Sequence, residues 1–260
     1  MTSRLVLCLG DLFIPDRANQ RYDKTVLRPL TLDLAPNATR EQFKKLLTPG
    51  KIGQILCLGN LTSPSVYTFL RNLAPDLQLV KGDFDISLST PAPPNPNAAY
   101  AAPTDQVPVP TALSKVVTHG GLRIGFTHGH TIVPPGDPDS LLIAARQMDV
   151  DVLCWGGTCK FEAYEMEGKF FVNPGSATGA VSWSPDAELD SEGEAVSTPS
   201  FVLMDVSRHA SWANLVDLSD HPEQVQGDVL VLYVYQLRKD QNGVENVAVE
   251  KVSYRKNASS

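Results

Sequence analysis

The chain has 260 residues, 42% of them hydrophobic, with 22 basic and 29 acidic side chains, a formal net charge of -7 and an isoelectric point near 5.2. This length and apolar content allow a large buried core, and we expect one domain over residues 1–260 with loop insertions. The acidic balance, without a cluster of Lys and Arg, argues against an extended nucleic-acid or anionic-membrane surface.

The first residues run directly into an apolar strand, without the apolar stretch and cleavage site of a secretory signal peptide. Cys8, Cys57 and Cys154 lie within apolar runs, and this scattered distribution favours buried free thiols in a reducing compartment over a disulfide framework. No run reaches the roughly 18 apolar residues of a membrane span. We therefore expect a cytoplasmic protein whose membrane association depends on a partner.

The first third of the chain alternates strands and helices. The pattern predicts buried strands at residues 5–9, 52–58 and 77–80. Helices are predicted at residues 37–47 and after Ser63, which caps a helix with Pro64 at its first position. This βαβαβ order implies right-handed crossovers and a largely parallel sheet, with ligand positions at the carboxyl ends of its strands.

The rest of the chain is richer in strands. It contains one further helix, which begins at Asp137 or Asp139, and two hairpins with turns at Gly120-Gly121 and Glu167-Gly168. The predicted strands cover residues 115–118, 122–127, 150–155, 161–166, 169–172, 201–206, 229–237 and 247–254. We expect the β-rich remainder after residue 200 to form a second sheet that packs on the first, with the helices outside.

Four segments are predicted to be insertions in loops. Residues 90–110 are rich in Pro, Ala and Asn, whose side chains contribute little to an apolar core. Residues 185–198 are acidic and rich in small residues. Residues 19–39 and 208–227 are less biased in composition.

Polar residues follow the strand ends in the order that two-metal phosphoesterases use for their ligands. These residues are Asp11, Asn60, Asp83, His128 and His130. A working centre of this kind needs two cations roughly 3.5–4 Å apart, held by imidazoles and carboxylates around a bridging water. The two histidines that flank Gly129 indicate either metal binding or hydrogen bonds to carboxylates and loop carbonyls.

Several ligands that such a centre needs are missing. Phe13, Gly157 and Cys159 stand where imidazoles are expected, and Asn60 offers a neutral amide where a carboxylate would bridge two cations. Phe84 replaces the imidazole that would protonate a leaving group. The sequence thus predicts no catalytic residue and no resident cofactor, with a vestigial metal site at Asp11, Asn60, Asp83 and His128 that binds at most one divalent metal weakly.

Two apolar segments are candidates for partner binding. Ile132-Val133-Pro134-Pro135 follows directly on His130, so it lies beside the degraded site as a docking surface or as a locally packed loop. Val231, Tyr233 and Tyr235 alternate onto one face of a strand whose other face is also apolar. This strand is either buried under a helix or carries an aromatic patch for a partner.

Taken together, the motifs resemble the family of vacuolar protein sorting-associated protein 29, the small subunits of retromer, within the calcineurin-like phosphoesterase superfamily. The resemblance covers nearly the whole chain outside the insertions. It is carried by Gly10-Asp11-Leu12-Phe13-Ile14-Pro15, residues 43–51, Gly82-Asp83-Phe84-Asp85, His128-Gly129-His130, Lys160-Phe161-Glu162-Ala163, residues 173–179 and residues 201–205.

The resemblance implies a metallophosphoesterase-like α/β/β/α sandwich of two mixed sheets with flanking helices. It further implies a non-catalytic scaffold for endosomal cargo sorting and endosome-to-Golgi retrograde transport, peripheral on endosomal membranes. In that family the degraded metal face docks on the C-terminal solenoid of vacuolar protein sorting-associated protein 35, in assembly with vacuolar protein sorting-associated protein 26. The docking residues would be Ile132, Val133 and Pro134.

An apolar patch on another face recruits regulatory proteins in that family. By motif, the patch falls on Leu5, Leu46, Leu47, Leu203, Tyr233, Tyr235 and Val249. Two other functions stay open at this point. One is a divalent-metal-dependent phosphoesterase with a reduced site of Asp11, Asn60, Asp83 and His128, and the other is an adaptor that uses only the patch around Tyr233.

Overall fold

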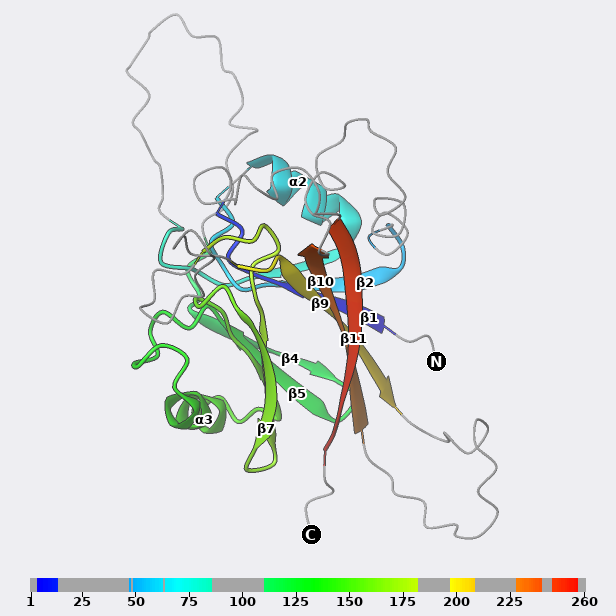
Figure 1. The fold of residues 1–260 in the computed structure, drawn as a ribbon. Helices are drawn as coiled ribbons and strands as arrows, with labels where there is room; N and C mark the ends of the chain where they lie inside the picture. The colour runs from blue at the N-terminus through cyan, green and yellow to red at the C-terminus, as the bar shows by residue number, and fades with distance from the viewer. Residues whose placement is uncertain are drawn as a thin grey trace, which may run out of the picture.

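The structure is a computed structural model that describes residues 4–13, 47, 49–62, 64–85, 110–181, 197–208, 228–239 and 245–256. The described residues form two β-sheets with one helix outside each (Figure 1). The first sheet has the strand order β11 (Glu245–Arg255), β10 (Asp228–Lys239), β9 (Ser200–Arg208), β1 (Arg4–Leu9), β2 (Ile52–Cys57), β3 (Asp76–Leu79). The second has the order β4 (Ser114–His119), β5 (Leu122–Thr127), β6 (Val152–Cys154), β8 (Lys169–Pro174), β7 (Phe161–Met166).

Three apolar clusters hold these layers together. Helix α2 (Pro64–Leu73) packs Val66, Leu70 and Leu73 against the outer face of the first sheet. A second cluster, which includes Val6, Phe126 and Leu232, fills the space between the two sheets. Helix α3 (Pro138–Gln147) covers the outer face of the second sheet with Leu141, Leu142 and Ala145. The layer order is therefore α/β/β/α, as predicted.

Both sheets are mixed. In the first, β1, β2 and β3 pair in parallel, as the βαβαβ pattern predicts, whereas β9 joins the free edge of β1 in antiparallel orientation. In the second, β5, β6 and β8 are parallel, and antiparallel hairpins add β4 and β7.

The predicted sheet membership of the last three strands is wrong. Strands β9, β10 and β11 extend the first sheet, and the second sheet is built from residues 114–174. The parallel β1, β2 and β3 unit leaves one edge of β1 unpaired, and β9 satisfies the backbone groups of that edge. Pairing across about two hundred residues leaves no local mark in the sequence.

The predictions that depend on neighbouring residues in the sequence agree with the structure. Helix α3 begins after Asp137, which is its N-cap, and helix α2 begins at Pro64. Glu167 and Gly168 both have positive φ angles, 49° and 71°, as a tight two-residue hairpin turn requires. Cys8, Cys57, Cys154 and Cys159 are all buried thiols outside any disulfide, which confirms the prediction for the thiols.

Several predictions lie outside the described residues. These are the body of the helix at residues 37–47, the cap residue Ser63, and nearly all of the insertions at 19–39, 90–110, 185–198 and 208–227. Within the described part of the chain, neither helix has the length and apolar character that a membrane crossing would require.

Candidate functional site

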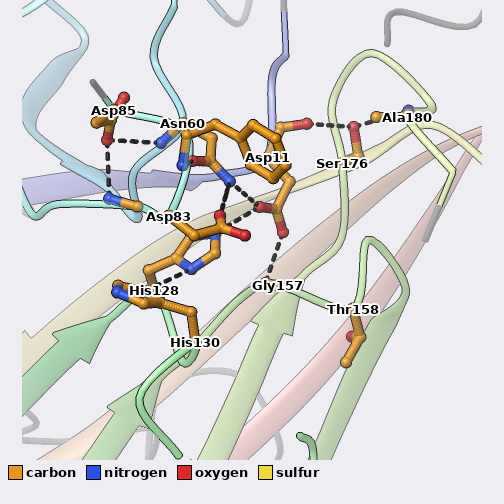
Figure 2. A network of polar contacts seen from close by, with 12 residues as sticks. Asp11, Asn60, Asp83, Asp85, His128, His130, Gly157, Thr158, Ser176 and Ala180 are labelled. Atoms are coloured by element: carbon orange, nitrogen blue, oxygen red, sulfur yellow. Dashed lines mark hydrogen bonds and ion pairs between the residues drawn. The ribbon is translucent and has the colours of Figure 1, made fainter. Parts of the chain in front are cut away.

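The predicted ligand positions come together where strands of both sheets end. Asp11 follows β1, Asn60 follows β2, Asp83 lies after β3, and His128 follows β5 (Figure 2). Asp11 and Asn60 have left-handed backbone conformations, with φ angles of 52° and 56°. Asp and Asn tolerate this region better than most residues, so sharp turns can direct both side chains into the same space.

Asp11 is the centre of the polar contacts. Its side chain is fully buried, and one oxygen, Oδ1, lies 2.9 Å from His128 Nε2. The other oxygen, Oδ2, accepts a hydrogen bond of 2.7 Å from the backbone N–H of Gly157. A buried carboxylate without such partners would be costly, so these contacts offset the cost of burying the side chain.

The Asn60 side chain bridges the carboxylates. Its amide Nδ2 lies 3.2 Å from Asp11 Oδ1 and 3.0 Å from Asp83 Oδ1, while its Oδ1 accepts a hydrogen bond of 3.0 Å from the backbone N–H of Phe84. The amide thus presents hydrogens, not an oxygen, to the two acidic side chains. This orientation places a hydrogen-bond donor where a cation would otherwise neutralise the carboxylates.

His128 completes this network. Burial acts to lower the pKa of His128, but the hydrogen bond and charge of Asp11, together with the charges of Asp83 and Asp85, raise its pKa above the ordinary value. The pKa of His130 is lowered by partial burial and by the neighbouring His128. His128 Nε2 lies 2.9 Å from Asp11 Oδ1 and 2.7 Å from Asn60 Nδ2, and His128 Nδ1 lies 3.1 Å from His130 Nδ1.

Residues to which the sequence analysis gave no role hold this arrangement in place. Asp85 is buried and accepts hydrogen bonds of 2.8 Å from the backbone N–H groups of Asn60 and Gly82, which joins the two loops. Ser176 Oγ donates to the backbone oxygen of Asp11 over 2.7 Å, and Thr178 Oγ1 donates to that of Leu12 over 2.8 Å. The only signal in the sequence is the position of these residues inside two of the family motifs.

The other half of the predicted metal site, around Phe13 and Cys159, is apolar. Phe13, Cys159 and Ala180 are buried and pack together as a small cluster. The ring of Phe13 also meets the ring of Phe84 edge-on, with centroids 5.4 Å apart. Phe13 and Cys159, which stand at two of the positions where a two-metal centre would carry imidazoles, therefore belong to a packed apolar cluster.

The third of these positions, Gly157, has a backbone conformation that residues with a side chain rarely adopt. Its φ angle is 90°, and a Cβ there would lie 3.3 Å from the backbone oxygen of His128. A histidine at this place would need a different loop path.

The residues present do not fit a two-metal centre. A metal ion needs several ligand atoms directed at one empty point. In this structure the polar side-chain atoms of Asp11, Asn60, Asp83 and His128 contact one another instead. Among the residues that the structure describes, no group of three or more His, Cys, Asp and Glu side chains is arranged to hold a metal ion. We therefore derive no reaction step through a metal.

Comparison with known proteins identifies the family of this chain. Residues 37–207 match the family model described as the calcineurin-like phosphoesterase superfamily domain. Vacuolar protein sorting-associated protein 29 of Schizosaccharomyces pombe is 42% identical over 252 residues, which cover 97% of this chain and 98% of the relative. The chain belongs to the vacuolar protein sorting-associated protein 29 family, within the calcineurin-like phosphoesterase superfamily.

Solved structures of this family support the assignment. The crystal structure of Chaetomium thermophilum Vps29 has 44% sequence identity and a TM-score of 0.65, and the match covers 97% of each chain. Vps29 of Entamoeba histolytica in complex with zinc has 30% identity and a TM-score of 0.59, with 96% of this chain and 98% of that chain covered. The predicted family and fold class are confirmed.

The structure also places the predicted partner residues. Ile132 is half-buried and packs on the cluster under α3, Val133 has 76% of its surface exposed, and Pro134 is exposed. The residues predicted to form the apolar patch for regulatory proteins, here called the regulator patch, differ in burial. Val249 is exposed, Leu5 and Tyr233 are half-buried, Leu47, Leu203 and Tyr235 belong to the core, and Leu46 lies outside the described residues.

Proposed function

We propose that this chain is a non-catalytic scaffold subunit of retromer that acts in endosomal cargo sorting and endosome-to-Golgi transport. Its face beside the old metal site would dock on the C-terminal solenoid of vacuolar protein sorting-associated protein 35, in a complex that also holds vacuolar protein sorting-associated protein 26. Membership of the vacuolar protein sorting-associated protein 29 family supports this proposal.

The observation that carries the docking proposal is the exposure of Val133. At 76%, its side chain is the most exposed of the large hydrophobic residues in the described part of the chain. Val133 also lies three residues after His130, next to a site whose polar groups are directed at one another. An exposed apolar side chain at the rim of a site without a complete metal centre suits a protein interface better than a substrate pocket.

We further propose that the regulator patch, which lies over the first sheet, recruits regulatory proteins. Of its described members, Val249, Tyr233 and Leu5 reach the surface, so these would contact a partner. Tyr235 stacks on Phe201 with ring centroids 5.0 Å apart and would support the patch from within, as would Leu203 and Leu47. Leu46 completes the proposed set.

We also propose a location and a domain organisation for the chain. The chain would be cytoplasmic and reach endosomal membranes through the complex, without inserting into the bilayer. We also propose that residues 1–260 form one domain, because both sheets share a single apolar interior.

The Val133→Asp variant tests the docking. A standard interface buries about 1,600 Å² in total, and loss of a central contact typically costs about 2 kcal/mol or more, which raises Kd roughly thirtyfold. We expect calorimetry with the purified solenoid fragment to show at least this loss, while Val249→Asp binds like the wild type. Unchanged binding by Val133→Asp would contradict the docking proposal.

A second candidate function is a divalent-metal-dependent phosphoesterase with a reduced site. The retained contact between His128 and Asp11, at 2.9 Å, favours it, since both residue types serve as metal ligands in such enzymes. Turnover of a generic phosphodiester in the presence of manganese, abolished by His128→Ala, would establish this function. We expect no turnover above the rate of the His128→Ala variant.

A further inference from the structure

The segment that carries Val133 is held by its own backbone at both ends. It links His130 to helix α3 through residues 131–137. The backbone N–H of Ile132 donates to the oxygen of Gly129 over 3.0 Å, and the N–H of Asp137 donates to the oxygen of Pro134 over 3.2 Å. These bonds fix the two ends of the loop but leave the carbonyl of Val133 itself to another partner.

That partner is the first turn of α3. Asp137 is the N-cap, and its Oδ2 accepts a hydrogen bond of 2.8 Å from the backbone N–H of Ser140. Ser140 in turn donates from Oγ to the backbone oxygen of Val133 over 3.1 Å. A chain of hydrogen bonds thus runs from the capping carboxylate to the main chain of the most exposed apolar residue.

The loop is also seated on the molecule from below. Ile132 packs against the cluster that contains Trp155 and Leu141. Gly136 lies close to Trp155, because a Cβ at Gly136 would lie 3.3 Å from the ring atom Cη2. The φ angle of Gly136 is 73°, so glycine suits both the close approach and the backbone conformation.

We propose that Asp137 and Ser140 are positioning residues for docking on the solenoid subunit. They hold the main chain of Val133 in its projecting conformation before the partner arrives. The inference rests on the proposed function and deepens it. A segment that is already ordered loses less conformational freedom on binding, so the same contacts give a higher affinity.

The hydroxyl of Ser140 can be removed without disturbing the cap of the helix. Ser140→Ala keeps the backbone N–H that Asp137 accepts from, and alanine is a good helix former, so we expect this variant to fold. It removes only the bond to the Val133 oxygen. Ser140→Thr is the matched control because threonine retains a hydroxyl group at the same carbon.

The test is the rate and equilibrium constant for binding to the purified solenoid fragment, measured by surface plasmon resonance. Since one neutral hydrogen bond is typically worth about 0.5–1.5 kcal/mol, Ser140→Ala should raise Kd by about two- to twelvefold. Most of the change should appear as slower association, because fewer loops are in the binding conformation at any moment. Ser140→Thr should restore the wild-type constants.

A second pair of variants acts at the cap. Asp137→Ala removes the acceptor for Ser140 and should raise Kd at least as much as Ser140→Ala, whereas Asp137→Asn still caps the helix and should bind like the wild type. Gln147→Ala, at the far end of α3, serves as the helix control. Thermal unfolding of all variants separates a loss of helix stability from a loss of binding.

Val133→Asp distinguishes the two proposals. If Val133→Asp abolishes binding while Ser140→Ala and Asp137→Ala bind with wild-type rates, the positioning role is overturned and the docking surface stands. If Val133→Asp binds like the wild type, the docking surface and the positioning role are both overturned. Slow association of Ser140→Ala, restored in Ser140→Thr, supports the inference.

Discussion

The two halves of the predicted metal site differ in their chemistry. In one half, Asp11, Asn60 and His128 remain polar and bond to one another. In the other half, Phe13 and Cys159 have joined an apolar cluster with Ala180. Both halves are buried and closely packed, so the same interior supports a polar network and an apolar one.

The difference shows how an interior accommodates the two kinds of side chain. Where an apolar side chain stands at a ligand position, it fills its space by packing and needs no hydrogen-bond partner. Where carboxylates remain, they need hydrogen-bond donors in place of the cation. Here the Asn60 amide, the His128 ring and the Gly157 N–H contact Asp11. The comparison predicts that the polar half is sensitive to single substitutions and the apolar half is more tolerant.

The largest expected effect is at Asp11. Asp11→Ala removes the buried carboxylate that faces His128, Asn60 and the Gly157 N–H, so the Gly157 N–H loses its acceptor and the buried His128 loses its nearest carboxylate. We expect the free energy of unfolding to fall by about 3–5 kcal/mol, as measured by urea denaturation.

Asp11→Asn is the matched control for this prediction. It keeps the shape of the side chain, an oxygen acceptor and tolerance of the φ angle of 52°. It should therefore lose less than half as much stability. Equal stability of wild type and Asp11→Ala would mean that the polar half is not a structural unit.

The sequence predicted this region unevenly, for physical reasons. The strand ends, the cap at Asp137 and the turn at Gly168 are set by neighbouring residues, so local patterns revealed them. The Asp85 contact to Asn60 spans 25 positions, and that of Ser176 to Asp11 spans 165, so neither leaves a local pattern. Two-residue periodicity placed Tyr233 and Tyr235 on one face, but it could not indicate how deeply each is covered.

The next effect tests whether the apolar half can be made to bind a metal. Phe13→His with Cys159→His would place two imidazoles in the apolar cluster and leave Gly157, with its φ angle of 90°, unchanged. Without metal, buried imidazoles in an apolar cluster should lower the thermal unfolding midpoint. Zinc at a hundred times its Kd should then restore about 2.7 kcal/mol of stability.

The wild-type chain is the control for this experiment. Because the polar side chains of its predicted metal site are hydrogen-bonded to one another, we expect the same zinc concentration to change its unfolding midpoint little. The contrast would be lost if zinc stabilised the wild type as much as the double variant. That result would indicate that the polar half alone holds a cation.

The smallest expected effect is at Phe84, on the rim of the apolar half. Its ring is 40% exposed and meets Phe13 edge-on, so Phe84→Ala removes one aromatic contact and little buried surface. The free energy of unfolding should fall by about 0.5–1.5 kcal/mol, much less than for Asp11→Ala. Phe84→Leu, which keeps an apolar side chain over Phe13, should recover part of the loss in the same urea titration. A loss at Phe84 as large as at Asp11 would show that the rim contact stabilises the site as strongly as its buried carboxylate, against the difference between the two halves.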